Sequence, residues 1–283
     1  MPDAKPRRIG LIAGGGRLPH LFASTARERG ISVVATAHRG QTDASLEGEV
    51  DAITWVRVGQ LDRMVRVFRN AQVASAVMVG GIGRARAIRE ARPDLGAFRV
   101  AMRLRSFRDD ALLRAVASYF EEHGISIVPQ TDFLSDLLAP HGQLAGPALS
   151  SGQEKDVALG LEVAQLLGKA DVGQTVVVKD GQVLALEAAE GTDETIRRGS
   201  RIAGAGVVVV KVFKPGQDAR FDLPAVGRTT FQVMRECSAA VLAVEAGKTL
   251  IVDAAAFLSE AEEAGISVVG IRGTGSDPAS PPR

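Results

Sequence analysis

In the first 140 residues, short continuous apolar runs alternate with segments in which apolar residues recur every three or four positions. Continuous apolar runs predict buried strands at residues 7–13, 31–38, 51–58 and 75–81. Apolar positions repeated every three or four residues predict helices at residues 18–30, 61–73 and 108–124. Strands separated by helices of this length are typical of βαβ units with a parallel sheet. Residues 1–140 are therefore expected to form one α/β domain.

After residue 140, the pattern of apolar and polar residues is interrupted by a short segment and then becomes more varied. Residues 141–152 are rich in Pro, Gly and Ser and show no period, which indicates a linker. Beyond it, two apolar runs meet at Asp180-Gly181, a dipeptide that favours a tight hairpin turn. Apolar runs and amphipathic segments then alternate further along the chain. We expect a distinct α/β domain with a mixed sheet at residues 153–272 and a disordered tail at residues 273–283.

Composition is that of a soluble globular protein, with 46% hydrophobic and 24% charged residues. No apolar run approaches the roughly 20 residues that cross a bilayer. The N-terminus lacks the apolar core of a signal peptide, so a cytoplasmic protein is expected. The single cysteine, Cys237, excludes an internal disulfide. The four scattered histidines do not have the spacing of a zinc site.

Arginine is concentrated in one part of the first half. Between Arg57 and Arg114 there are thirteen arginines, no lysine and five acids. One interpretation is a set of solvated helix faces; the other is a basic surface for phosphates or an anionic membrane. Nucleic acid is not expected as a partner, because ten Phe, one Tyr and one Trp offer few rings for base stacking.

Glycine-rich turns follow two of the predicted strands. The first, GLIAGGGRLP at residues 10–19, precedes a helix, and the second, VMVGGIGRAR at residues 77–86, repeats the arrangement. Turns at the carboxyl ends of neighbouring parallel strands flank the crevice where such sheets bind ligands. Neither turn matches GxGxxG or GxxxxGK[ST]. Tight turns without a ligand would also explain them, but a phosphorylated ligand such as a nucleotide or nucleotide sugar is favoured.

Acidic residues gather in the second half. Glu187 and Glu190 end an apolar run, and Thr192 is expected to cap a helix that has Asp193 in its first turn. Asp218, Arg220 and Asp222 alternate, and in an extended strand all three would project from one face. Carboxylates near the lysines at 211 and 214 suit Mg²⁺ bound against phosphate oxygens. A solvated charged loop is the alternative.

Five long motifs make the chain similar to the LpxI family of UDP-2,3-diacylglucosamine pyrophosphatases of lipid A synthesis: GLIAGGGRLP, DDALLRAVASYFEEHG, LALEAAEGTDETIRR, VVVVKVFKPGQDARFDLPAVG and AVLAVEAGKTLIVD. The resemblance extends to about residue 272. It implies a Rossmann-like N-terminal domain, a distinct C-terminal domain and a site in the cleft between them. It also implies Mg²⁺-dependent hydrolysis of UDP-2,3-diacylglucosamine to UMP and 2,3-diacylglucosamine 1-phosphate (lipid X).

The resemblance also implies roles for individual residues. Asp222 is the leading catalytic candidate, and Ala225 stands where threonine is as common in the family. The other expected catalytic residues are Asp193, Asp218 and Lys214. The expected metal ligands are Asp222, Asp218 and Glu190. The expected substrate-binding residues are Gly14, Gly15, Gly16, Leu18, Pro19, Gly80, Gly81, Thr192, Lys211 and Arg220. Peripheral attachment to the inner membrane and a homodimer are further expectations.

The sequence leaves two rival functions open. An NAD-dependent oxidoreductase would use the glycine-rich domain, but GxGxxG and a ribose-binding acid at the usual offset are missing. A nucleotide-sugar sensor without catalysis would bind ligand and have no use for the acids at 193, 218 and 222. Alanine at those three positions would leave a sensor intact and would inactivate an enzyme.

Overall fold

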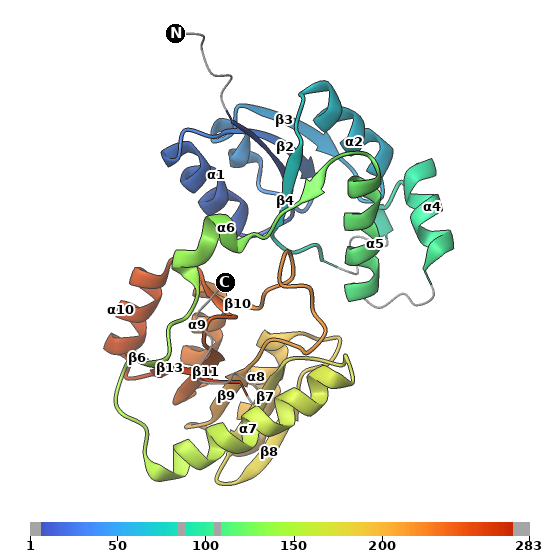
Figure 1. The fold of residues 1–283 in the computed structure, drawn as a ribbon. Helices are drawn as coiled ribbons and strands as arrows, with labels where there is room; N and C mark the ends of the chain where they lie inside the picture. Colours follow the sequence, from blue (N-terminus) through green and yellow to red (C-terminus); the bar gives the residue numbers. More distant parts are fainter. Residues whose placement is uncertain (1–6, 84–88, 105–108, 274–283) are drawn as a thin grey trace. The chain divides into compact units, whose positions relative to one another are not determined.

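The computed structural model describes residues 7–83, 89–104 and 109–273, which form two compact units (Figure 1). The N-terminal unit contains residues up to 135 together with residues 218–222. The C-terminal unit contains residues 136–217 and the chain from residue 223 onward. The predicted tail lies outside the described residues except for Gly273.

The N-terminal unit is built on a five-stranded parallel sheet of order β3-β2-β1-β4-β5, which confirms the predicted α/β domain. Figure 1 shows α1 and α6 on one side of this sheet and α2, α4 and α5 on the other. The elements are β1 (Arg8–Ala13), α1 (Leu18–Glu28), β2 (Ser32–His38), η1 (Ala44–Gly48), β3 (Ala52–Val56), α2 (Leu61–Asn70), β4 (Ser75–Val79), α4 (Leu95–Arg103), α5 (Asp109–Glu122), β5 (Ser126–Ile127) and α6 (Thr131–Leu134).

Helices cover both faces of this sheet, which is why its strands are apolar runs rather than alternating ones. Phe68 of α2 and Phe120 of α5 are fully buried, with ring centroids 6.1 Å apart. Phe221, from the segment 218–222, packs into the same cluster. This short segment therefore contributes to a core almost 100 residues away along the chain.

The C-terminal unit has a six-stranded mixed sheet of order β6-β13-β11-β9-β7-β8, as the sequence predicted. Strands β9, β11 and β13 are parallel, and β6, β7 and β8 pair antiparallel with their neighbours. After η2 (Ser135–Leu137), the elements are β6 (Gly142–Ala145), α7 (Ser151–Lys169), β7 (Thr175–Lys179), β8 (Gln182–Leu186), α8 (Thr192–Ala203), β9 (Val208–Lys211), β10 (Ala225–Val226), α9 (Arg228–Glu236), β11 (Val241–Glu245), β12 (Leu250–Ile251), α10 (Ala254–Ala264) and β13 (Ser267–Ile271).

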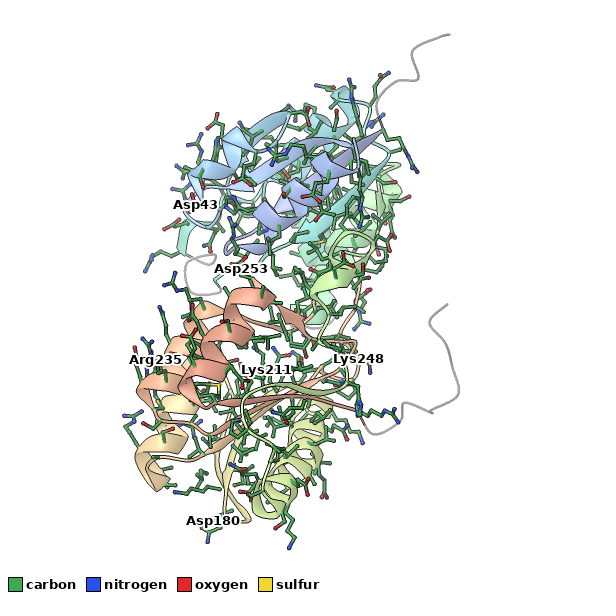
Figure 2. The ribbon with its side chains drawn as sticks, turned by 90° about the vertical axis from the view of Figure 1, so that its left-hand side faces the viewer. Asp43, Asp180, Lys211, Arg235, Lys248 and Asp253 are labelled. Atoms are coloured by element: carbon green, nitrogen blue, oxygen red, sulfur yellow. The ribbon has the colours of Figure 1, made fainter. Side chains whose placement is uncertain are left out.

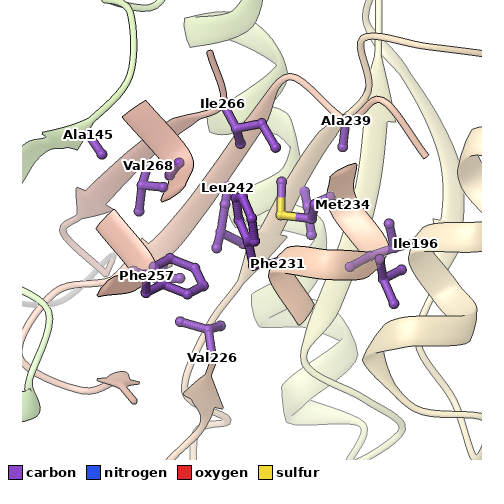
Figure 3. Close-up of a cluster of buried hydrophobic side chains, with 14 of the residues drawn as sticks. Ala145, Ile196, Val226, Phe231, Met234, Ala239, Leu242, Phe257, Ile266 and Val268 are labelled. Atoms are coloured by element: carbon purple, nitrogen blue, oxygen red, sulfur yellow. The ribbon is translucent and has the colours of Figure 1, made fainter. Parts of the chain in front are cut away.

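Strand β9 explains why residues 207–210 are a continuous run of valine. Val208 and Val210 pack with α7 on one face, whereas Val209 packs on the other face with residues of α8 and α9, such as Ile196 and Phe231 (Figure 3). A strand buried on both faces needs apolar side chains at every position. The side-chain period of two then turns the last residue of β9 toward the face that α8 and α9 cover.

The predicted hairpin turn at Asp180-Gly181 and the predicted linker at residues 141–152 both lie in the C-terminal unit. Asp180 and Gly181 have φ of 50° and 74° and join the antiparallel pair β7 and β8, so the hairpin is confirmed. The stretch 141–152 contains β6 and the Ser150 cap of α7, whose side chain accepts from the backbone N–H of Gln153. Within the described ranges, no helix is long and apolar enough to cross a membrane.

Candidate active site

A buried lysine lies at the centre of the polar cluster in the C-terminal unit. Lys211, the last residue of β9, is only 6% exposed, and Figure 2 labels it within this unit. Its Nζ donates to Thr192 Oγ1 at 3.1 Å and to the Ala225 carbonyl at 2.9 Å. An ammonium has three N–H donors. Within the described residues two are used, which leaves one for a ligand.

Thr192 has a different role from the helix cap that the sequence suggested. Gly191, with φ of 84°, is the N-cap of α8, and Thr192 is the first helical residue. Because Gly191 makes the entry turn, the Thr192 hydroxyl is not needed as a cap. It accepts from Lys211, lies 3.2 Å from Thr175 Oγ1 and donates to Glu187 Oε1 at 3.3 Å.

Glu187 is the site residue that the sequence argument noticed without assigning a role. It follows β8 and is 7% exposed, and its Oε2 is buried without a hydrogen-bond partner within the described structure. A buried carboxylate oxygen left unpaired costs about 1–3 kcal/mol or more. Such an oxygen marks a position where a water or a ligand donor belongs.

Charge in this cluster is balanced by two acids around one base. Burial lowers the pKa of Lys211, whereas Glu187 and Asp193 act in the opposite direction and favour its protonated form. Asp193 stands in the first turn of α8, and its Oδ1 accepts from Thr230 Oγ1 at 3.5 Å. The cluster therefore presents an ammonium and the N-terminus of a helix, both suited to an anion.

The segment 218–222 forms a turn, so the extended conformation that would have placed the three side chains on one face is not present. The backbone N–H of Asp222 donates to the Asp218 carbonyl at 3.0 Å, as in a helical turn. The cause is local, because the Asp218 carboxylate accepts from the Arg220 backbone N–H at 3.1 Å and from its Nη2 at 2.8 Å. The Arg220 guanidinium holds the pKa of Asp218 below its usual range.

Contacts within the N-terminal unit hold this turn in place. Arg220 Nη1 donates to Glu121 Oε1 at 2.9 Å, and the Arg220 carbonyl accepts from the Gln130 backbone N–H at 2.8 Å. The predicted site residues are thus divided between the two units. Asp218, Arg220 and Asp222 belong to the N-terminal unit, whereas Glu190, Thr192, Asp193, Lys211 and Lys214 belong to the C-terminal unit.

The two glycine-rich turns pack directly on each other. The backbone N–H of Gly14 donates to Val79 O at 2.8 Å, and that of Gly15 donates to Gly81 O at 2.7 Å. A Cβ at Gly14 would lie 2.5 Å from the Gly80 carbonyl oxygen. Close backbone approach therefore accounts for Gly14, Gly15 and Gly80, whereas a Cβ at Gly81 would meet nothing within 4 Å. Gly16, with φ of 87°, leads into α1, which begins at Leu18-Pro19, and Arg84 and Arg86 lie outside the described residues.

Two other predicted residues have partners elsewhere. Lys214 Nζ binds Asp171 Oδ1 at 2.9 Å. Glu190 pairs with the Arg198 guanidinium, and a hydrogen bond from its own backbone N–H and then Arg198 lower its pKa.

The described carboxylates do not form a complete metal site by themselves. Within the described residues, no group of three His, Cys, Asp or Glu side chains could hold a metal ion. Glu190 is committed to Arg198, and Asp218 is shared with Arg220. The side chains at 218 and 222 fit Mg²⁺ only as one or two ligands, with water and phosphate oxygens supplying the others, which is the usual arrangement for this ion.

Comparison with known proteins assigns the chain. The model for the LpxI N-terminal domain matches residues 8–137, and the model for the LpxI C-terminal domain matches residues 140–269. The chain belongs to the LpxI family. A relative from Caulobacter vibrioides, named UDP-2,3-diacylglucosamine pyrophosphatase LpxI, is 32% identical over 277 residues, which cover 94% of this chain and 98% of the relative.

Solved structures give much weaker similarities than the Caulobacter relative does. A glycinamide-RNase-transformylase T from Mycobacterium tuberculosis has a TM-score of 0.27 and 16% identity, over 64% of this chain and 44% of that one. The biotin carboxylase domain of a Hydrogenobacter thermophilus 2-oxoglutarate carboxylase has a TM-score of 0.28 and 15% identity, over 71% of this chain and 42% of that one. Scores this low support no conclusion about the LpxI fold or its ligands.

Proposed function

We propose that the chain hydrolyses the diphosphate of UDP-2,3-diacylglucosamine and releases UMP and 2,3-diacylglucosamine 1-phosphate, with Mg²⁺ as cofactor. The observation that carries this proposal is the Caulobacter relative of that name, which aligns with 94% of the chain. The buried Lys211 cluster supports it, because a diphosphate needs a cation and N–H donors.

The polar cluster of the C-terminal unit would bind the diphosphate. The remaining N–H of Lys211 would donate to a phosphate oxygen, and the ammonium would stabilise charge that develops there in the transition state. Thr192 and the Ala225 carbonyl hold the Lys211 side chain in place, and Glu187 in turn accepts from Thr192. The unpaired Oε2 of Glu187 would accept a hydrogen bond from a water or a sugar hydroxyl.

Acids on the segment 218–222 would position the attacking water. Asp222 is our leading catalytic residue, and Arg220 orients Asp218 through the contacts described above. Mg²⁺, when bound by Asp218 and Asp222 together with phosphate oxygens, would withdraw charge from the diphosphate. The acyl chains of the substrate lie in a bilayer, so we place the enzyme at the cytoplasmic face of the inner membrane as a peripheral protein.

Release of UMP from UDP-2,3-diacylglucosamine, first with Mg²⁺ and then with EDTA, tests the proposal. Metal-dependent release is expected. Asp222→Ala should keep substrate binding and turn over at least about 100-fold more slowly, which is the usual contribution of a catalytic group. Tight binding without turnover by the unaltered enzyme would instead favour a nucleotide-sugar sensor, and full activity of Asp222→Ala would remove that residue from the mechanism.

A further inference from the structure

Helix α4 presents a row of large apolar side chains to solvent. Leu95, Phe98 and Met102 are 70%, 59% and 66% exposed. Residues three and four positions apart share a helix face, so these three form one stripe, called here the α4 stripe. Gly96 and Val100 on the same helix are buried instead. Single exposed apolar residues are ordinary, but three on one short helix indicate an interaction surface.

The helix that carries the α4 stripe is anchored by its other side. Asp94 caps it by accepting from the backbone N–H of Ala97 at 3.1 Å, and Asp62 of α2 accepts from the backbone N–H of Gly96 at 2.8 Å. At its end, Arg103 forms an ion pair with Glu122 of α5 at 2.7 Å. The stripe is therefore held on a fixed element, and its outward direction is set by the packing of the helix.

Charge along residues 89–103 is mainly positive, with Arg103 paired with Glu122 and three other arginines in the segment. Residues 89–103 contain four arginines and two acids, and Arg89, Arg92, Arg99 and Arg103 are all exposed. One of the two acids, Asp94, is occupied as the helix cap. An apolar row flanked by arginines is the pattern of a helix that lies in the interface of an anionic bilayer. A second copy of the chain fits less well, because two-fold pairing would bring the same arginines face to face.

We propose that the α4 stripe docks the protein on anionic lipid, with its three apolar side chains in the acyl boundary and Arg89, Arg92 and Arg99 on the headgroups. The proposed function supplies the reason for such docking, since its substrate is a lipid. Docking is nevertheless a separate property, because it can be measured on vesicles that contain no substrate.

Vesicle flotation with the full chain tests the proposal. The wild-type protein should bind phosphatidylglycerol vesicles, bind phosphatidylcholine vesicles more weakly, and lose the difference at high salt. Leu95→Gln, Phe98→Gln and Met102→Gln together should weaken binding at least about tenfold, because three apolar side chains no longer leave water. The matched control is Leu166→Gln with Ile202→Gln, two residues of the C-terminal unit that are 58% and 64% exposed. It should bind as the wild type does.

A spectroscopic variant reports the insertion directly. With Trp55→Phe as background, Phe98→Trp should shift its emission to shorter wavelength when phosphatidylglycerol vesicles are added. Three results would overturn the proposal. The first is no vesicle binding by the wild type, or equal binding by the triple variant and the control. The second is that the wild type and the control are dimers in sedimentation velocity, whereas the triple variant is a monomer. The third is that the triple variant docks on vesicles as the wild type does but has a raised KM for detergent-dispersed substrate. That result would assign the stripe to acyl-chain recognition.

Discussion

Replacement of Glu187 by glutamine removes one charge from the buried cluster and keeps its shape. Lys211 Nζ lies 3.1 Å from Thr192 Oγ1, which lies 3.3 Å from Glu187 Oε1, so the two charges are at most about 6.4 Å apart. At an effective dielectric constant of about 20, they attract each other by at least about 2.6 kcal/mol. Loss of that attraction favours the neutral amine of Lys211 and lowers its pKa further.

The assay for Glu187→Gln is the pH profile of kcat/KM for UMP release. Burial already lowers the pKa of Lys211, and the variant removes an interaction that opposes this effect. The alkaline decline of activity should therefore begin at lower pH than in the wild type. Glu194→Gln is the matched control, because Glu194 is also near the start of α8 but is solvent-exposed and pairs with Arg197. It should leave the profile in place.

Stability gives a second measurement of the same effect. Where burial lowers the pKa of a lysine, the unfolded chain binds a proton that the folded protein has lost, so stability rises with pH up to the unfolded pKa of about 10.4. This rise should start at lower pH in Glu187→Gln. Identical profiles of activity and of stability in the variant and the wild type would refute the assignment of Glu187 as the residue that keeps Lys211 charged.

Three further predictions concern the framework around the site. The Asp156 carboxylate accepts from the backbone N–H groups of Asp180 at 2.9 Å and Gly181 at 2.7 Å, so Asp156→Ala should lower the free energy of unfolding in urea by about 2–4 kcal/mol. In α7, a Cβ at Gly160 would lie 2.5 Å from Val210 Cγ2, whereas one at Gly152 meets only Ser150 Oγ at 3.9 Å. Gly160→Ala should therefore destabilise by about 1–3 kcal/mol and Gly152→Ala should stabilise by about 0.5–1 kcal/mol; the same sign for both would contradict the packing argument. Burial, and then the contact with Asp62, raise the pKa of Tyr119 to about 12. Its stabilising contribution should be complete below pH 10 and decline by about 1.4 kcal/mol per pH unit as pH rises toward 12, a decline that Tyr119→Phe removes.

The sequence predicted features that depend on neighbouring residues and missed those that depend on distant ones. The parallel sheet, the mixed sheet and the Asp180-Gly181 turn follow from periodicity and from local turn preference. Helix α4 was missed because its outward stripe and its buried glycine do not give the usual amphipathic pattern. Alternation of charges at residues 218–222 would have placed three side chains on one face only in an extended strand, and the tendency of aspartate to bind nearby backbone N–H groups produces a turn instead.

In the candidate site, too, the sequence indicated some residues and missed others. Lys211 and Thr192 were singled out through the family resemblance, and their hydrogen bond now joins the end of β9 to the start of α8. Thr175 and Thr230 also reach the cluster, but nothing in their sequence context distinguishes them from other threonines in strands and helices. The glycines of the two turns were predicted as ligand contacts, and the structure accounts for those at 14, 15 and 80 through close backbone packing, whereas Gly81 has open space at its Cβ position.

The excursion of residues 218–222 into the N-terminal unit has a consequence for how the gene can be divided. The two family models meet near residue 138 as consecutive halves, yet a fragment that ends there lacks Phe221 from its own core. It also leaves the backbone N–H of Gln130 without its acceptor. Recombination between relatives at that junction would pack residues 218–222 of one relative into the N-terminal unit of another. The halves must therefore be inherited together, or exchanged only between sequences that agree at Arg220 and Phe221.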